Sequence, residues 1–234
     1  MPLRIGFDLD GTLADFASAF HEVEVRLFGR DSHIEAGQPE RESEEPVAAD
    51  AARPAKIPSF IQGRRRRDRI WDEIRKTPDF WSTLKALDPS AVRRIYDLTI
   101  QHKWEVFFIT QRPYTDGETV QRQSQRWLVQ QGFDMPSVLV IGGSRGAAAA
   151  ALRLDYHVDD SAQNCLDVSI ESAAKPILLV PDDNEGIIAQ SRKLKIGTAP
   201  SIAAALDVLD KTTLARTQPT ILNRIAAIVG WTDR

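Results

Sequence analysis

Acidic residues that end apolar segments are the side chains of this sequence best suited to chemistry. Asp8 and Asp10 end one such segment, and Asp159 and Asp160 end another. Thr110 ends a third. Apolar runs of this length are typical of strands buried on both faces, and ligands of an open parallel sheet bind beyond the carboxyl ends of its strands. We therefore expect four carboxylates and one hydroxyl to meet in one crevice.

The chemistry expected of this cluster is phosphate transfer at a magnesium ion. Four carboxylates repel one another unless a cation lies among them, and carboxylate oxygens are ligands that Mg²⁺ prefers. Asp8 can attack as a nucleophile while Asp10 moves protons, and Thr110 can donate a hydrogen bond to a phosphate oxygen. Phosphoryl transfer also recruits positive charge. Arg145, in a glycine-rich loop before a predicted helix, is the best placed candidate.

Alternating helical and strand-like segments are predicted to position these residues. From residue 106 onward the alternation favours a parallel sheet covered by helices, an α/β fold. Asp88 is expected to cap a helix that starts at Pro89. The other predicted helices cover 15–28, 64–76, 117–131, 146–154, 162–172, 200–209 and 219–229, and the predicted strands cover 3–9, 106–110, 138–141, 156–160, 176–180 and 195–197.

Composition places the chain among ordinary globular proteins. It has 234 residues, of which 42% are hydrophobic and 27% charged, and its net charge of −3 excludes a global basic surplus. The single cysteine, Cys165, excludes an intramolecular disulfide, so a reducing cytoplasm is expected. There is no signal-peptide pattern and no apolar stretch of about 18 residues. We expect a soluble protein that binds neither membrane nor nucleic acid; the oligomeric state stays open.

The acidic motifs resemble those of the haloacid dehalogenase (HAD) superfamily. Its first motif, Asp-x-Asp-Gly-Thr, matches residues 8–12 in full, its second matches Thr110, and its fourth matches Asp159 and Asp160. The resemblance implies a HAD-like three-layer Rossmannoid core with a parallel sheet. It also implies that Asp8 becomes an aspartyl-phosphate and that Asp10 is the general acid and base.

The same resemblance implies a metal and a phosphate site. Mg²⁺ would be held by Asp8, by the backbone carbonyl of Asp10 and by Asp160, with Asp159 as a neighbouring or water-mediated ligand. The third motif is normally Lys, and here Arg145 takes its position. Arg carries the same charge as Lys but is bulkier, so the two residues are not interchangeable. The residues expected to bind phosphate or substrate are Gly11, Thr12, Thr110, Gln111, Arg112 and Arg145.

Members of the superfamily commonly insert a cap between the first two motifs. We therefore expect a catalytic core at 1–13 and 104–215, a small helical cap at 14–103 and a C-terminal helix at 216–234. Residues 31–56 contain three prolines and a glutamate cluster but almost no bulky apolar side chains. Such a composition predicts a mobile loop.

Several local segments narrow the resemblance further. Residues 79–84, 110–113, 126–128 and 158–165 are similar to the 5'(3')-deoxyribonucleotidase branch, which dephosphorylates nucleoside monophosphates. A small phosphate ester, a nucleotide among the candidates, is the expected substrate. Two alternatives stay open. One is an enzyme similar to polynucleotide 3'-phosphatases, and the other is a catalytically weak fold that binds a phosphorylated ligand or a protein partner.

Two further features have both a functional and a structural interpretation. The run Arg64–Arg67 could grip a substrate phosphate, but a run of charges is more often a solvated helix face. Trp71, Phe80 and Trp81 could stack on a base, but large aromatic residues in a small cap more often form its core. We favour the structural interpretation of both.

Overall fold

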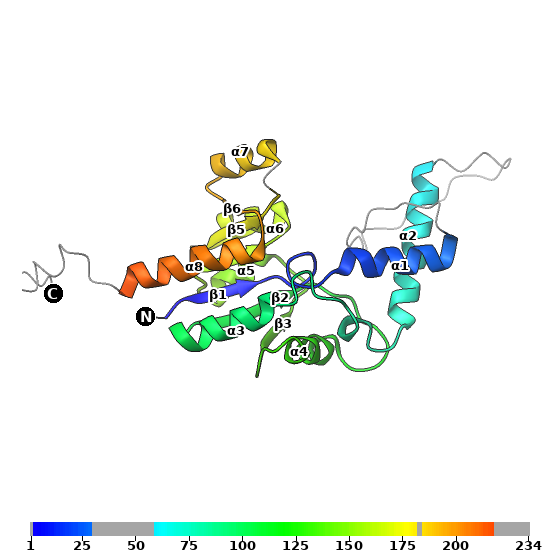
Figure 1. Cartoon of the computed structure of the whole chain (residues 1–234). Coiled ribbons are helices and arrows are strands. Elements are labelled where there is room, and N and C mark those ends of the chain that lie inside the picture. Colours follow the sequence, from blue (N-terminus) through cyan, green and yellow to red (C-terminus); the bar gives the residue numbers. More distant parts are fainter. Residues whose placement is uncertain (1, 30–58, 182–183, 218–234) are drawn as a thin grey trace, which may run out of the picture.

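A six-stranded parallel sheet forms the centre of the protein (Figure 1). The computed structural model describes residues 2–29, 59–181 and 184–217. The strand order is β3-β2-β1-β4-β5-β6, which confirms the predicted α/β fold. The strands are β1 Arg4–Phe7, β2 Glu105–Thr110, β3 Ser137–Val140, β4 Tyr156–Asp159, β5 Lys175–Leu179 and β6 Gly197–Ala199.

Helices cover both faces of this sheet, so the core has three layers. In β2, Phe108 faces the larger apolar cluster, which includes α3 (Ala91–His102), α4 (Val120–Gln130) and α8 (Ile202–Thr217). Ile109 faces the opposite cluster, which includes α5 (Arg145–Ala151) and α6 (Ala162–Glu171). Both residues have no exposed surface. Burial on both faces explains why the strands are continuous apolar runs.

Two helices form a lobe that projects away from the carboxyl end of the sheet (Figure 1). They are α1 (Phe16–Phe28) and α2 (Ser59–Lys76). The Phe16 ring packs on the rings of Trp71, Trp81 and Phe20 at centroid distances of 5.4, 5.6 and 5.8 Å. Trp71, Phe80 and Trp81 are at most 5% exposed and belong to the larger apolar cluster, which agrees with the structural interpretation of these aromatic residues.

Several local predictions differ from the structure. The helix predicted at 200–209 is α8, which ends at Thr217 and so crosses the predicted boundary at 215, and the helix predicted at 64–76 begins at Ser59. The helix after Asp88 begins at Ala91, and Ser90 occupies its N-cap position without a capping hydrogen bond from its side chain. The Asp88 carboxylate accepts from the backbone N–H and the hydroxyl of Ser90 and so forms the preceding turn instead. The last strand lies two residues later than expected. The helix α7 (Glu185–Lys193) and the short 3-10 helix η1 (Phe80–Ser82) were not predicted. Ser191 is the buried residue of α7, so its apolar pattern is weak.

The proposed division into core and cap stays a prediction, with one structural qualification. Helix α3 falls within 14–103, yet it packs on α8 of the core: the Arg94 guanidinium donates to the Ala203 carbonyl, and His102 lies 2.6 Å from Asp210. The predicted loop at 31–56, the helix at 219–229 and most of 216–234 lie outside the described residues. Among the helices of the described ranges, none combines the length and apolarity that a membrane crossing requires.

Candidate active site

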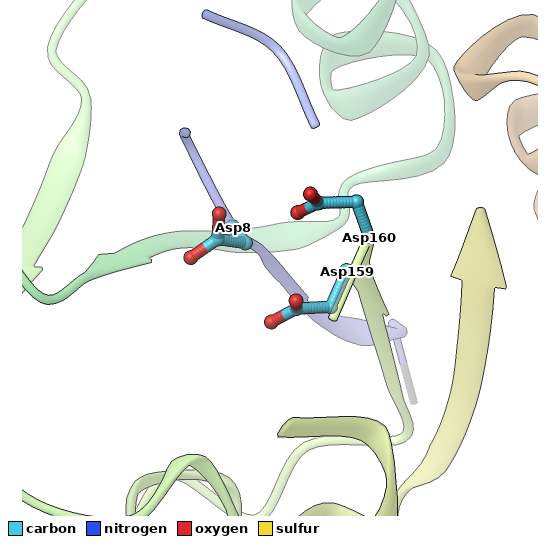
Figure 2. Close-up of side chains that lie close together, drawn as sticks. All are labelled: Asp8, Asp159 and Asp160. Carbon is cyan, nitrogen blue, oxygen red and sulfur yellow. The ribbon is translucent and has the colours of Figure 1, made fainter. Parts of the chain in front are cut away.

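Strands β1 and β4 bring three of the predicted carboxylates together. The two strands are neighbours, with Phe7 opposite Val158, so the residues that follow them meet at one edge of the sheet. Carboxylate oxygens of Asp8, Asp159 and Asp160 all lie within 4.8 Å of one another, and Figure 2 shows the three groups gathered in one place. Three oxygen ligands at this spacing suit a hard divalent cation such as Mg²⁺.

The raised pKa values of Asp8 and Asp160 indicate that this cluster can hold a cation. Burial raises the pKa of Asp8 well above its ordinary value, the nearby Asp159 raises it further, and Arg145 opposes both effects. Burial and Asp159 raise the pKa of Asp160 to about 6. A divalent cation would favour the ionised form of both carboxyl groups. The donor set therefore matches the metal that the sequence predicts.

The Arg145 side chain lies against this carboxylate cluster. Its Nη2 donates to Asp8 Oδ1 at 2.6 Å, and its Nε is 3.7 Å from Asp159 Oδ2. Ser144 caps the helix that Arg145 begins, which places the side chain at the carboxyl end of the sheet. Nε and Nη1 of Arg145 are buried and donate no hydrogen bond to the residues described. Buried donors require acceptors, and phosphate oxygens would supply them.

Asp10 is held by Arg112, which the sequence predicts to bind phosphate or substrate. The Arg112 guanidinium donates from Nε and Nη2 to both carboxylate oxygens of Asp10, at 2.7–3.2 Å. Its third nitrogen donates to Ser124 Oγ at 2.8 Å, and its Cζ lies over the Trp81 ring, 4.8 Å from the ring centroid. The Arg112 side chain has no exposed surface. Its guanidinium is therefore committed to Asp10, whereas the motif resemblance implies contact with substrate.

The loop after β1 is shaped by close packing against the fourth motif. Gly11 has a φ of +84°, and a Cβ at this position would lie 2.1 Å from Asp160 Oδ2. Only glycine fits such a backbone without strain. The Thr12 hydroxyl donates to Asp160 Oδ1 at 3.2 Å, and the Thr110 hydroxyl donates to Asp10 Oδ2 at 3.3 Å. Thr12 is 2% exposed and thus orients Asp160 rather than facing the cavity.

Asp159 is fixed by partners that sequence reasoning missed. His157 Nε2 lies 3.0 Å from Asp159 Oδ2, and the Asn164 side-chain amide donates to both oxygens at 3.1 Å. The backbone N–H of Ser161 donates to Oδ1 at 2.8 Å. These contacts hold the Asp159 carboxyl group in one orientation. The period of two along β4 places His157 on the same face as Asp159, a signal that was available in the sequence.

A cavity of about 360 Å³ opens over these groups. Of the predicted site residues, Thr12, Arg112 and Asp159 lie outside its wall. The predicted residues in the wall are Asp8, Asp10, Gly11, Thr110, Gln111, Arg145 and Asp160. The wall also contains Phe16, Ala17, Ser161, Gln163 and Asn164, which were not predicted as contacts. Residues 161–164 directly follow the fourth motif and were within reach of sequence reasoning, whereas nothing in the sequence pointed to Phe16.

Comparison with known proteins decides the fold. No protein-family model and no curated protein matches the chain. Among solved structures, a HAD family hydrolase from Deinococcus radiodurans with bound phosphate and sodium is 15% identical, with a TM-score of 0.52 over 90% of this chain and 96% of that one. The protein has a HAD-like fold.

Two other solved structures align with this chain over similar lengths. A D,D-heptose 1,7-bisphosphate phosphatase from B. bronchiseptica, complexed with magnesium and phosphate, is 17% identical, with a TM-score of 0.48 over 91% of this chain and 99% of that one. A hydrolase from Pseudomonas syringae is 12% identical, with a TM-score of 0.49 over 89% and 98%. Along the present chain, Asp8 follows β1, Thr110 ends β2, Arg145 lies after β3 and Asp159 ends β4.

Proposed function

We propose that this protein is a Mg²⁺-dependent phosphomonoester hydrolase, a HAD-type phosphatase that works through an aspartyl-phosphate on Asp8. One observation carries the proposal: the buried Asp8 carboxylate contacts Arg145, which keeps two buried nitrogens without a hydrogen-bond partner among the described residues. A nucleophile beside unsatisfied cationic donors is suited to a phosphate group. The carboxylates of Asp159 and Asp160 add a cation site on the same edge of the sheet.

The metal would be held by residues of the first and fourth motifs. We assign Asp8, Asp160 and the backbone carbonyl of Asp10 as ligands, with Asp159 as a neighbour that is direct or water-mediated. When bound, Mg²⁺ supplies positive charge that screens the nucleophile from the incoming phosphate. The raised pKa values of Asp8 and Asp160 support this assignment, because ionised carboxylates so close together need a counter-charge.

The proposed reaction has two displacement steps. Asp8 Oδ attacks phosphorus as the ester oxygen leaves, and Asp10 gives that oxygen its proton. Asp10 then takes a proton from water as the water oxygen attacks the aspartyl-phosphate, which releases inorganic phosphate and frees Asp8. Arg145 and Thr110 donate hydrogen bonds to phosphate oxygens. Arg112 holds the carboxylate of Asp10 in one orientation through both steps.

Nucleoside monophosphates are the substrates that we propose first. The similarity of residues 110–113 and 158–165 to the deoxyribonucleotidase branch supports this choice. The Deinococcus hydrolase of similar fold was solved with bound phosphate, which supports a phosphorylated ligand for this chain. We also propose a cytoplasmic location, on the ground of the single cysteine.

Phosphate release from a panel of nucleotides and sugar phosphates tests the proposal. We expect hydrolysis in Mg²⁺ that stops in EDTA and that Asp8→Asn abolishes. Asp97→Asn makes the same chemical change on the exposed face of α3 and should leave the rate unchanged. Full activity of Asp8→Asn would overturn the nucleophile assignment. Failure of the unmodified protein to release phosphate from any ester would instead favour a fold that only binds its ligand.

A further inference from the structure

The active-site cavity has a wall of uncharged side chains around its catalytic groups. This part of the wall comes from the start of α1, from the residue after Thr110 and from the start of α6. Its side chains are those of Phe16, Ala17, Gln111, Ser161, Gln163 and Asn164. Within the described part of the wall, Arg145 is the single cationic side chain.

The charges of the catalytic groups leave no cation for a second anion. Two guanidinium groups face four carboxylates: Arg112 is paired with Asp10, and Arg145 contacts Asp8 and lies 3.7 Å from Asp159. Arg145 is therefore the one cationic side chain in the described part of the wall that can turn to the reacting phosphate. A second anionic group would lie near carboxylates without a counter-charge, which is costly.

The uncharged wall offers hydrogen bonds and one apolar surface. No hydrogen bond of the Gln111 carboxamide is found among the described residues, so both its donor and its acceptor can meet a ligand. Gln163 donates through Nε2 to Asp167 at 2.7 Å, which leaves its carbonyl oxygen to accept. Phe16 presents a phenyl ring whose position is set by stacking on Trp71 at 5.4 Å. Neutral amides beside an aromatic ring suit a hydroxylated ligand with an apolar face.

We propose that the leaving group of the substrate is uncharged and hydroxylated, and that Gln111 and Gln163 select it. The site then accepts monophosphate esters of nucleosides, sugars or polyols and rejects esters whose leaving group carries a carboxylate or a second phosphate. This inference rests on the proposed phosphatase function. It favours nucleoside monophosphates over a nucleic-acid 3'-phosphate, whose leaving group carries a phosphodiester charge nearby.

Matched pairs of esters test this selectivity, because the two members of a pair differ in charge but little in size. Suitable pairs are glycerol 3-phosphate with 3-phosphoglycerate, glucose 6-phosphate with 6-phosphogluconate, and AMP with adenosine 3',5'-bisphosphate. We expect kcat/KM to be about tenfold or more higher for the uncharged leaving group of each pair that is turned over. Equal values within the pairs would overturn the inference and leave the phosphatase function standing. Release of phosphate from no ester would overturn both.

Charge-introducing variants test the two glutamines. Gln111→Lys and Gln163→Lys should raise kcat/KM by about tenfold for the ester of each pair whose leaving group is anionic. The difference in kcat/KM between the two esters of a pair, here called the gap, should therefore become smaller. Gln190→Lys adds the same charge on exposed α7, outside the cavity wall, and should leave the gap unchanged. If the pairs differ as expected but neither lysine narrows the gap, the assignment of these two residues is wrong.

Discussion

The bidentate contact between Arg112 and Asp10 indicates that this arginine orients Asp10 rather than binding substrate. The motif resemblance implies that Arg112 binds substrate, whereas the structure directs its guanidinium to both oxygens of Asp10, to Ser124 and to the Trp81 ring. A residue that binds substrate mainly affects KM. A residue that orients the general acid mainly affects kcat. We expect Arg112→Ala to lower kcat and to leave KM nearly unchanged.

The size of the effect follows from the burial of the pair. Removing one partner of a buried ion pair costs about 3–5 kcal/mol, and the Asp10 side chain keeps 22% exposure, so we expect the lower end of that range. A loss of about 3 kcal/mol lowers the melting temperature of a protein of this size by about 6–12 °C. Displacement of a catalytic group by 1 Å can cost about 100-fold in rate, so kcat should fall by about that factor.

Melting curves and Michaelis–Menten kinetics on a good substrate measure both effects. Arg112→Lys keeps the charge but loses the planar fork, so its losses should fall between those of the unmodified protein and Arg112→Ala. Arg93→Ala is the control, because its partner Asp97 is exposed and the pair contributes less than about 1 kcal/mol. A raised KM with kcat intact would refute the positioning role and restore Arg112 as a substrate contact.

Three further predictions concern the acid cluster and its surroundings. The pKa of Asp160 is raised from 3.8 to about 6, so between pH 3.8 and about 6 the folded metal-free protein binds more protons than the unfolded chain, and its stability should fall as pH rises. Denaturation in EDTA should show this fall in stability, and Asp160→Asn should reduce it. Mg²⁺ should stabilise the protein more above about pH 6 than below pH 3.8. Gly11→Ala forces a Cβ against Asp160 at a φ of +84° and should lower both melting temperature and activity, whereas Gly143→Ala, with open space around it, should change neither. Burial raises the pKa of the Cys165 thiol, so a thiol reagent should label Cys165 only as the protein unfolds, and rapid labelling of the folded protein would contradict its packing.

Much of the candidate site could be predicted because its residues follow strands. The apolar runs before Asp8 and Asp159 specify parallel strands, and the carboxyl ends of such strands share one edge of the sheet. The role of Arg112 could not be predicted in this way, because it depends on a contact across 102 positions of sequence with Asp10. The contact of His157 with Asp159 was missed, although the spacing of two residues places both side chains on one face of β4.

The sequence by itself determined the order of the strands' acidic endings and therefore which residues we assign to the proposed reaction, since hydrophobic periodicity and motif spacing are local properties of the chain. The tertiary structure decided which charges neutralise one another. It paired Arg145 with Asp8 and Arg112 with Asp10, and it placed Phe16 of α1 at the cavity. Such pairings depend on distances between segments far apart in sequence and on burial, which strengthens each charge interaction where water is excluded.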